Sequence, residues 1–230
     1  MARRPIFVPL HDDKRFVLER YVEFHWNAGM SVQQKQKNIR AIHEMARREY
    51  GLEKPLEVSS KSESELGFAL SSFNLIITTT KGQALTVEAA FQGSKVFERG
   101  GPYTDIFAMT PRDAKRDPRL RASGQLVQFS FFGRDWGLEP KTAFYDWLYI
   151  NALRSNPDLA NEVTDFNCFT DIEFNPDRSI NCQARSVALY CALFHTDRLN
   201  DALSSPEAFK LLYGGRVSEP GPAFAVQSLF

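Results

Sequence analysis

Cysteine is scarce in this chain. Its three cysteines, Cys168, Cys182 and Cys191, form no Cys-x-x-Cys pair. An odd number without such a pair argues against a disulfide framework and against a cysteine-based zinc site. We therefore expect free thiols in a reducing, cytoplasmic compartment, and we expect neither a metal nor another cofactor.

The chain also lacks a net charge and a long apolar run. Its 28 basic residues balance 28 acidic ones, so no global field draws it to nucleic acid or to a membrane. No segment approaches the roughly 20 apolar residues that a membrane-spanning helix needs. Contacts with nucleic acid would therefore have to come from a local patch.

One stretch could supply such a patch. Residues 112–121 contain five basic and two acidic residues, which makes them the most basic local stretch. Phosphate binding needs local positive charge and not a global excess. The alternative is a charged turn that contacts only solvent. The candidate DNA-contacting residues are Arg112, Lys115, Arg116, Arg119 and Arg121.

The size of the chain bounds its organisation. With 230 residues, 43% of them hydrophobic, it can bury one core, which favours a single domain with an extension. Near the N-terminus, alternation predicts a strand at residues 20–26, and the prolines in residues 5–9 favour a sheet edge or a lead-in. A capped helix is predicted over residues 31–50, with Gly51 as its stop. The polar residues 53–65 are expected to form a connecting loop.

The rest of the chain mixes short strands with helices. A turn at Lys81-Gly82 precedes a helix that begins at Thr86 and is expected to end within residues 95–100. The pattern predicts an α+β fold, helix-dominated, with a few short strands. Further strands are predicted at residues 68–80, 125–132 and 169–173, and further helices at residues 140–154, 158–166, 181–194 and 205–213.

The helix that begins at Thr86 carries the candidate chemistry. Glu88, Gln92 and Lys95 are spaced i, i+4 and i+7, which places them on one helical face. A carboxylate, an amide and an amine together can protonate a leaving group, orient a polar substrate and attack an electrophilic carbon. The alternative is an ordinary solvated helix face with an incidental charge pair.

The order of motifs around this helix resembles the NADAR family. Leu70-Ser-Ser-Phe-Asn74, a strand, a glycine turn and Thr86-Val-Glu-x-x-Phe-Gln-x-x-Lys95 follow the family pattern, although Ser72 replaces an Asn and Ala89 replaces a His. Two further motifs, Gly100-Gly-Pro-Tyr-Thr-Asp105 and Asn181-Cys-Gln-Ala-Arg185, resemble the antitoxin branch associated with DarT-type DNA ADP-ribosyltransferase toxins. The likeness implies a catalytic domain over residues 65–215, an N-terminal extension over residues 1–60 packed on it, and a C-terminal tail over residues 216–230.

This resemblance implies a function. NADAR proteins cleave N-glycosidic bonds on ribose, and this branch is associated with removing ADP-ribose from guanine in DNA. The expected substrate is ADP-ribosylated DNA with a single-stranded or extrahelical guanine, since the modified base must leave the stack to be reached. Two alternatives stay open: an N-glycosidase acting on ribosylamino intermediates of riboflavin metabolism, and a non-enzymatic antitoxin that binds and blocks the cognate toxin.

The resemblance also implies roles for individual residues. Glu88 would protonate the leaving nitrogen and then activate water, while Lys95 would either stabilise charge or attack the ring-opened sugar as a Schiff-base nucleophile. The pyrophosphate would rest on the Gly100-Gly101 loop and on Arg185, unless Arg185 is buried and paired with Asp171 or Glu173. The expected substrate-binding residues are Ser71, Phe73, Asn74, Gln92, Gly100, Gly101, Tyr103, Asp105, Glu173, Asn181 and Arg185.

Overall fold

The computed structural model describes residues 1–12, 15–79 and 81–213. The C-terminal tail expected at residues 216–230 lies outside the described residues. The fold is the predicted α+β arrangement, with several small sheets and a majority of helical elements. Within the described ranges, none of the helices combines the length and the apolar character that crossing a membrane would require.

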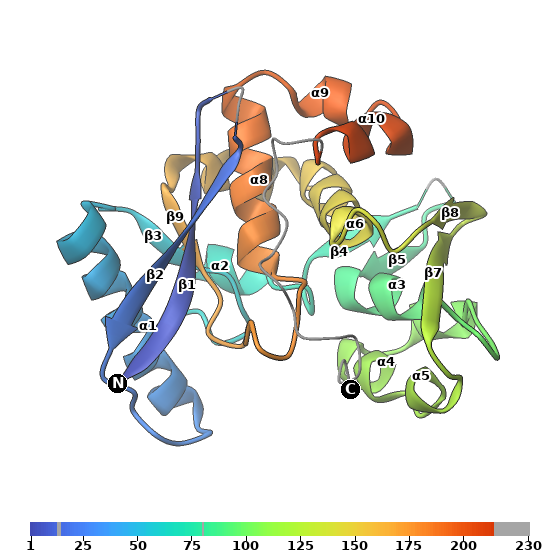
Figure 1. The fold of residues 1–230 in the computed structure, drawn as a ribbon, viewed down its shortest axis with the longest axis horizontal. Helices are drawn as coiled ribbons and strands as arrows, with labels where there is room; N and C mark the ends of the chain where they lie inside the picture. Colours follow the sequence, from blue (N-terminus) through green and yellow to red (C-terminus); the bar gives the residue numbers. More distant parts are fainter. Residues whose placement is uncertain (13–14, 80, 214–230) are drawn as a thin grey trace.

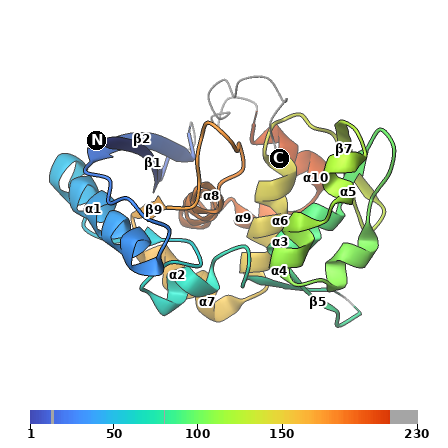
Figure 2. The ribbon, with the colours of Figure 1, turned by 90° about the horizontal axis from the view of Figure 1, so that it is seen from below.

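Helix α8 (Gln183–His195) lies at the centre of the molecule. Its residues are buried from the first turn to Leu193, as the strongly apolar sequence predicts. In Figures 1 and 2 it lies between the β1–β2 hairpin on one side and α6 (Ala143–Arg154) on the other. A helix that is apolar on all faces can pack against several elements at once, and α8 therefore joins the two halves of the fold.

The largest sheet has the strand order β2-β1-β9-β3. Strand β1 pairs with β2 over eight residues and with β9 at Phe7–Phe169 alone, and β9 runs parallel to β3. The expected sheet edge at residues 5–9 is therefore wrong. Prolines are tolerated in this inner strand because β9 meets it only at Phe7, between Pro5 and Pro9. The strands are β1 (Ala2–Pro9), β2 (Val17–Phe24), β3 (Pro55–Glu57) and β9 (Cys168–Thr170).

The long N-terminal helix forms as predicted. Helix α1 (Val32–Tyr50) is capped by Ser31, whose hydroxyl accepts from the Gln34 N–H, and it ends at Gly51 with a φ of 64°. The predicted loop at residues 53–65 is wrong in part, because it contains β3 and the start of α2. Strand β3 buries the charged Glu57, so it lacks the apolar alternation by which a strand is recognised in sequence.

The other half of the fold surrounds a short buried helix, α3 (Val87–Gly93). One prediction fails here and one is correct in part. Residues 95–100 do not finish α3 but begin strand β6 (Lys95–Phe97). Residues 68–80 contain the predicted strand, β4 (Ile76–Thr78), but they begin inside helix α2 (Glu65–Ala69). The predicted turn at Lys81-Gly82 is confirmed, with Gly82 at a φ of 77° between β4 and β5.

The remaining elements complete this half. They include an antiparallel hairpin, β4–β5, and an antiparallel sheet in the order β6-β7-β8. Helix α4 packs against α3, as do the 3₁₀ turn η1 and helix α6. The elements are β4 (Ile76–Thr78), β5 (Ala84–Thr86), η1 (Thr104–Ala108), α4 (Pro111–Arg116), α5 (Arg119–Ala122), β7 (Leu126–Phe131), β8 (Arg134–Trp136), α7 (Pro157–Glu162), η2 (Val163–Asp165), α9 (Leu199–Ala202) and α10 (Pro206–Leu211).

Candidate functional site

The carboxylate of Glu88 is buried in the first turn of α3. Thr86 caps this helix by accepting the Ala89 N–H, and the whole helix from Val87 to Gly93 is buried. Glu88 is only 5% exposed, so the alternative of a solvated helix face is excluded. A buried carboxylate needs hydrogen-bond partners, and Glu88 has two: its oxygens accept from Gln92 Nε2 at 2.9 Å and from Ser72 Oγ at 3.2 Å.

The loop that carries Ser72 is tied to three helices. The Ser72 carbonyl accepts the Glu88 N–H at 2.9 Å, and the Ser72 N–H donates to Gln183 Oε1 of α8 at 2.7 Å. The Tyr149 hydroxyl of α6 donates to the Leu70 carbonyl. Neither Gln183 nor Tyr149 is among the site residues predicted from sequence. Both hold the loop that holds Glu88.

Lys95 reaches this site from a strand. Helix α3 ends at Gly93, where a Cβ would lie 2.6 Å from the Phe107 ring, and Lys95 is the first residue of β6. Its ammonium lies 5.0 Å from the centroid of the Phe91 ring. The pKa of Lys95 is lowered to about 8, chiefly by burial; the Glu88 carboxylate opposes this shift and the positive charge of Lys115 adds to it. The predicted helical face is wrong for Lys95, but the predicted neighbourhood with Glu88 is correct.

The amide nitrogen of Gln92 is hydrogen-bonded, whereas its amide oxygen has no partner among the described residues. Its Nε2 donates to a Glu88 carboxylate oxygen, which turns the Gln92 carbonyl oxygen away from that carboxylate. That oxygen, on a side chain 7% exposed, is buried and bonds to none of the residues that the structure describes. A buried acceptor of this kind suits a ligand that brings its own donor.

Lys115 joins the site from a neighbouring helix. Its ammonium lies 4.0 Å from Glu88 Oε1 and 5.4 Å from the centroid of the Phe73 ring. The sequence assigned Lys115 to the basic stretch and Phe73 to substrate binding. The structure brings both to the exposed side of the Glu88 carboxylate, because α4 packs on α3.

Arg185 lies elsewhere. It is 4% exposed, and its Nη1 lies 2.6 Å from Asp146 Oδ2 and 3.0 Å from Thr142 Oγ1. The alternative considered from sequence, a buried and paired arginine, describes its environment, but its partner is Asp146 and not Asp171 or Glu173. Glu173 is instead half-exposed and bonded to Lys35 at 3.1 Å.

The glycine loop is filled by its own chain. A Cβ on Gly101, whose φ is 88°, would lie 2.3 Å from the Lys95 carbonyl, and one on Gly100 would lie 2.2 Å from the Tyr103 hydroxyl. The Gly100 N–H donates to the Phe97 carbonyl. The glycines therefore let this loop pack onto β6, which is how the structure uses the space that the sequence assigned to a pyrophosphate.

Two of the predicted substrate-binding residues, Tyr103 and Asp105, contact an arginine. Both carboxylate oxygens of Asp105 accept from Arg119, at 3.2 and 2.6 Å, and the guanidinium lies 4.5 Å from the centroid of the Tyr103 ring. Asp117 binds the same guanidinium at 2.7 Å. Hydrogen bonds from the Arg119 guanidinium lower the pKa of the Asp105 and Asp117 carboxyl groups. These residues form a cluster of their own beside α5.

The other predicted binding residues border the loop before β4. Asn74 Nδ2 donates to Ser71 Oγ at 3.0 Å and to the Phe68 carbonyl at 2.8 Å, so these side chains hold the local turn. Asn181 is half-buried in the segment before α8. Among the described side chains, no group of three or more His, Cys, Asp or Glu residues could hold a metal ion.

Comparison with protein families identifies the chain. Residues 2–220 match the model of a family described as DarT1-associated NADAR antitoxin. The chain belongs to this NADAR antitoxin family. A search of curated proteins found no match to the antitoxin. The match begins at residue 2 and therefore includes the N-terminal strands and α1.

The antitoxin presents a basic surface beside the Glu88 site. Arg112 and Arg116 of α4 and Arg121 of α5 are exposed, and none of the three forms an ion pair with a described residue. Arg119 differs, because its charge is neutralised by Asp105 and Asp117. The predicted basic stretch is therefore a surface of three available arginines plus Lys115 at its inner end.

The antitoxin also holds two neighbouring acids, Glu57 of β3 and Asp171, which follows β9. Glu57 is 2% exposed and accepts from Ser59, Thr170 and the Ile172 N–H at 2.6 to 2.8 Å. Burial and the nearby Glu57 raise the pKa of Asp171 well above its usual value. The sequence analysis missed Glu57, because a lone glutamate in a polar stretch gives no signal of burial.

Proposed function

We propose that this antitoxin is a hydrolase that removes ADP-ribose from guanine bases in DNA. One observation carries the proposal. A buried carboxylate, Glu88, is held by Gln92 and Ser72, and a lysine with a lowered pKa shares its environment. Reversal of the modification would make the protein an antidote to the toxin's product, with modified DNA and the cognate ADP-ribosyltransferase toxin as its partners.

The chemistry that follows uses each of these groups. The bond to be broken joins ribose C1 to the exocyclic amine of guanine, and an amino-linked sugar can open to an imine. The ring opens first: the C1–ring oxygen bond breaks, the N–H proton of the guanine amine moves to the ring oxygen, and C1 forms an imine with that nitrogen. The neutral Lys95 amine then adds to C1, so that its nitrogen forms a new bond there and one of its protons moves to the guanine nitrogen. The guanine amine then leaves with the bonding electrons and takes a proton from the Glu88 carboxylic acid. Water, deprotonated by the Glu88 carboxylate, hydrolyses the lysine imine and releases ADP-ribose.

Substrate access is consistent with a nucleic acid. The exposed arginines lie on α4 and α5, and α4 also carries Lys115, whose ammonium lies 4.0 Å from Glu88 Oε1. Basic side chains bind phosphates without sequence preference, so this surface would hold the DNA strand while one modified nucleotide enters the site. A small ribosylamino metabolite would make no use of these arginines.

Mass spectrometry of a guanine-ADP-ribosylated oligonucleotide tests the proposal. The wild type should remove the mass of ADP-ribose, whereas Glu88→Gln and Lys95→Ala should not. Matched controls are Glu44→Gln and Lys37→Ala, which change exposed residues of α1 and should retain activity. An oligonucleotide left unchanged by folded wild-type protein would reject the proposal. Protection of cells by the Glu88→Gln variant would favour a non-enzymatic antitoxin that binds the toxin.

A further inference from the structure

Tyr145 of α6 lies in the wall of the Glu88 site. Its ring packs edge-on against Phe91, with centroids 5.1 Å apart and planes at 86°. The Lys95 ammonium lies 5.0 Å from the centroid of the same Phe91 ring. Tyr145 and Lys95 are thus neighbours across one aromatic side chain, although they come from different elements.

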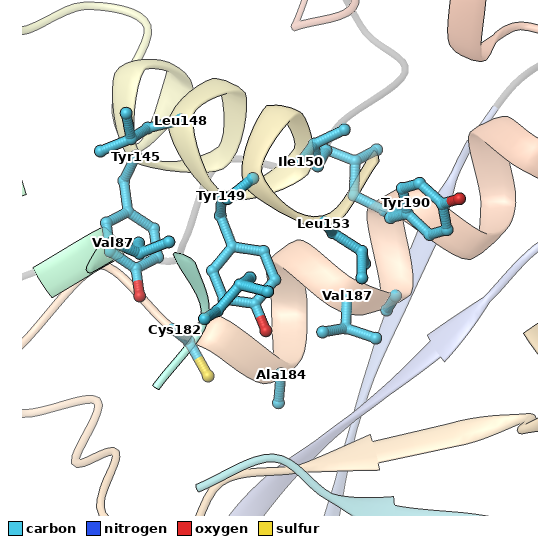
Figure 3. Packing of buried hydrophobic residues seen from close by; sticks show 14 of the residues in the cluster. Val87, Tyr145, Leu148, Tyr149, Ile150, Leu153, Cys182, Ala184, Val187 and Tyr190 are labelled. Carbon is cyan, nitrogen blue, oxygen red and sulfur yellow. The ribbon is translucent and has the colours of Figure 1, made fainter. Parts of the chain in front are cut away.

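The Tyr145 hydroxyl points in the direction of the loop that holds Glu88. Figure 3 shows the Tyr145 and Tyr149 rings extending from the same side of α6 toward Val87 and Cys182. The ring centroids of the two tyrosines are 6.2 Å apart. Since the Tyr149 hydroxyl bonds to the carbonyl of Leu70, the Tyr145 hydroxyl, one turn earlier on the helix, lies beside the same loop.

This hydroxyl has no protein partner among the described residues. Three tyrosines have a pKa raised well above the usual value by burial: Tyr145, Tyr149 and Tyr213. The hydroxyls of Tyr149 and Tyr213 donate to Leu70 and Asp146. The Tyr145 side chain is only 6% exposed, but its hydroxyl oxygen is not fully enclosed, so a ligand can reach it and accept its hydrogen bond.

The surrounding charges keep the proton on this oxygen. Burial raises the pKa of Tyr145 most, and the nearby Glu88, Tyr149, Asp171 and Cys182 raise it further. The phenol is therefore neutral across the physiological range and can donate a hydrogen bond. A donor that shares the Phe91 ring with Lys95 and lies close to Glu88 is placed to reach the sugar on which these two residues would act. The atoms bonded to C1 of this sugar or next to it include the ribose ring oxygen and the 2-hydroxyl oxygen, and both accept.

We propose that Tyr145 is a substrate-binding residue whose hydroxyl donates a hydrogen bond to a ribose oxygen next to the scissile bond. The proposal rests on the proposed function, since it places the ADP-ribose sugar between Glu88 and Lys95. It adds a contact that neither the sequence motifs nor the family match assigns. The ligand class is a ribose 5-phosphate derivative such as ADP-ribose, bound through its sugar.

Calorimetric titration with ADP-ribose tests this contact. Tyr145→Phe should bind ADP-ribose about 2- to 13-fold more weakly than the wild type, the range expected for one hydrogen bond. Its melting temperature should not fall, because the lost hydroxyl has no protein partner. Tyr190→Phe is the matched control: Tyr190 is also buried in the core, and in Figure 3 its hydroxyl points away from Tyr145 and Tyr149. This variant should bind like the wild type.

The outcomes separate this assignment from the proposed function. Wild-type protein that binds ADP-ribose and cleaves the oligonucleotide, together with Tyr145→Phe that does both equally well, would overturn the assignment alone. Slower cleavage by Tyr145→Phe with unchanged ADP-ribose affinity would also overturn it, since the contact would then not be to the sugar. Wild-type protein that neither binds nor cleaves would overturn the proposed function and the assignment together.

Discussion

The pH dependence of turnover distinguishes the two roles open to Lys95. A Schiff-base nucleophile must be a neutral amine, whereas a residue that stabilises negative charge must be an ammonium ion. The two roles predict opposite slopes as the pH rises through the pKa of Lys95. Burial places that pKa at about 8, inside the range in which enzyme assays are practical. We expect the rate to rise with pH.

The lowered pKa sets the size of the effect. With a pKa of about 8, about 9% of the Lys95 side chains are neutral at pH 7, compared with about 0.03% for an ordinary lysine with a pKa of 10.5. Burial therefore increases the reactive fraction about 300-fold. The neutral fraction reaches about half at pH 8 and about nine-tenths at pH 9. Turnover should rise about fivefold between pH 7 and pH 8 and less than twofold between pH 8 and pH 9.

The assay is release of ADP-ribose from a modified oligonucleotide at saturating enzyme, between pH 6 and pH 9.5. Lys115→Gln removes a positive charge that lowers the pKa of Lys95, so its rising limb should move to higher pH. Lys95→Arg keeps a positive charge without a nucleophilic amine and should be inactive. A rate that falls through pH 8, or an active Lys95→Arg variant, would refute the nucleophile and leave the electrostatic role.

Three further predictions concern the supports of the site. Arg121→Gln should weaken binding to unmodified single-stranded DNA and reduce the slope of log affinity against log salt concentration by about 0.7. Arg119→Gln should change this slope less, because the charge of Arg119 is already neutralised. Equal slopes for the two variants would contradict this. Arg185→Met should lower the free energy of unfolding, measured by urea denaturation, by about 3–5 kcal/mol, because it leaves Asp146 buried and unpaired. A variant that loses ligand affinity but keeps its stability would restore the pyrophosphate role of Arg185. Tyr149→Phe leaves the Leu70 carbonyl without its donor, so this variant should lose about 1–3 kcal/mol of stability and turn over more slowly. Wild-type kinetics in this variant would show that the Ser72 loop does not need this hydrogen bond.

Local signals in the sequence predicted the elements with strong boundaries. Ser31 and Gly51 bound α1 as expected, and Thr86 begins α3, because cap residues satisfy backbone groups within a few residues of themselves. The same holds for the Glu88–Gln92 contact, which is an i, i+4 pair within one helix. Such features depend on neighbours in sequence and can be read without the fold.

Features that depend on distant neighbours were not predictable. Lys95 was placed on a helix because nothing local shows that the ring of Phe107 packs against Gly93 and that the helix ends there. The partner of Arg185 lies 39 residues away on α6, so the sequence could suggest burial but not Asp146. Strand β3 exists because β9 pairs with it across more than a hundred residues.

The N-terminal strands support the Glu88 carboxylate through a continuous series of contacts. Strand β9 has three residues, too few to hold its place alone, and both of its neighbours, β1 and β3, precede residue 60. From β9 the chain passes Asp171 and reaches α8, whose Gln183 accepts the N–H of Ser72, and Ser72 bonds to Glu88. Lys35 of α1 adds an ion pair to the segment between β9 and α8. Without the N-terminal strands β9 would be unpaired on both sides, so this segment is part of the scaffold that holds Glu88 and cannot be regarded as an appendage to it.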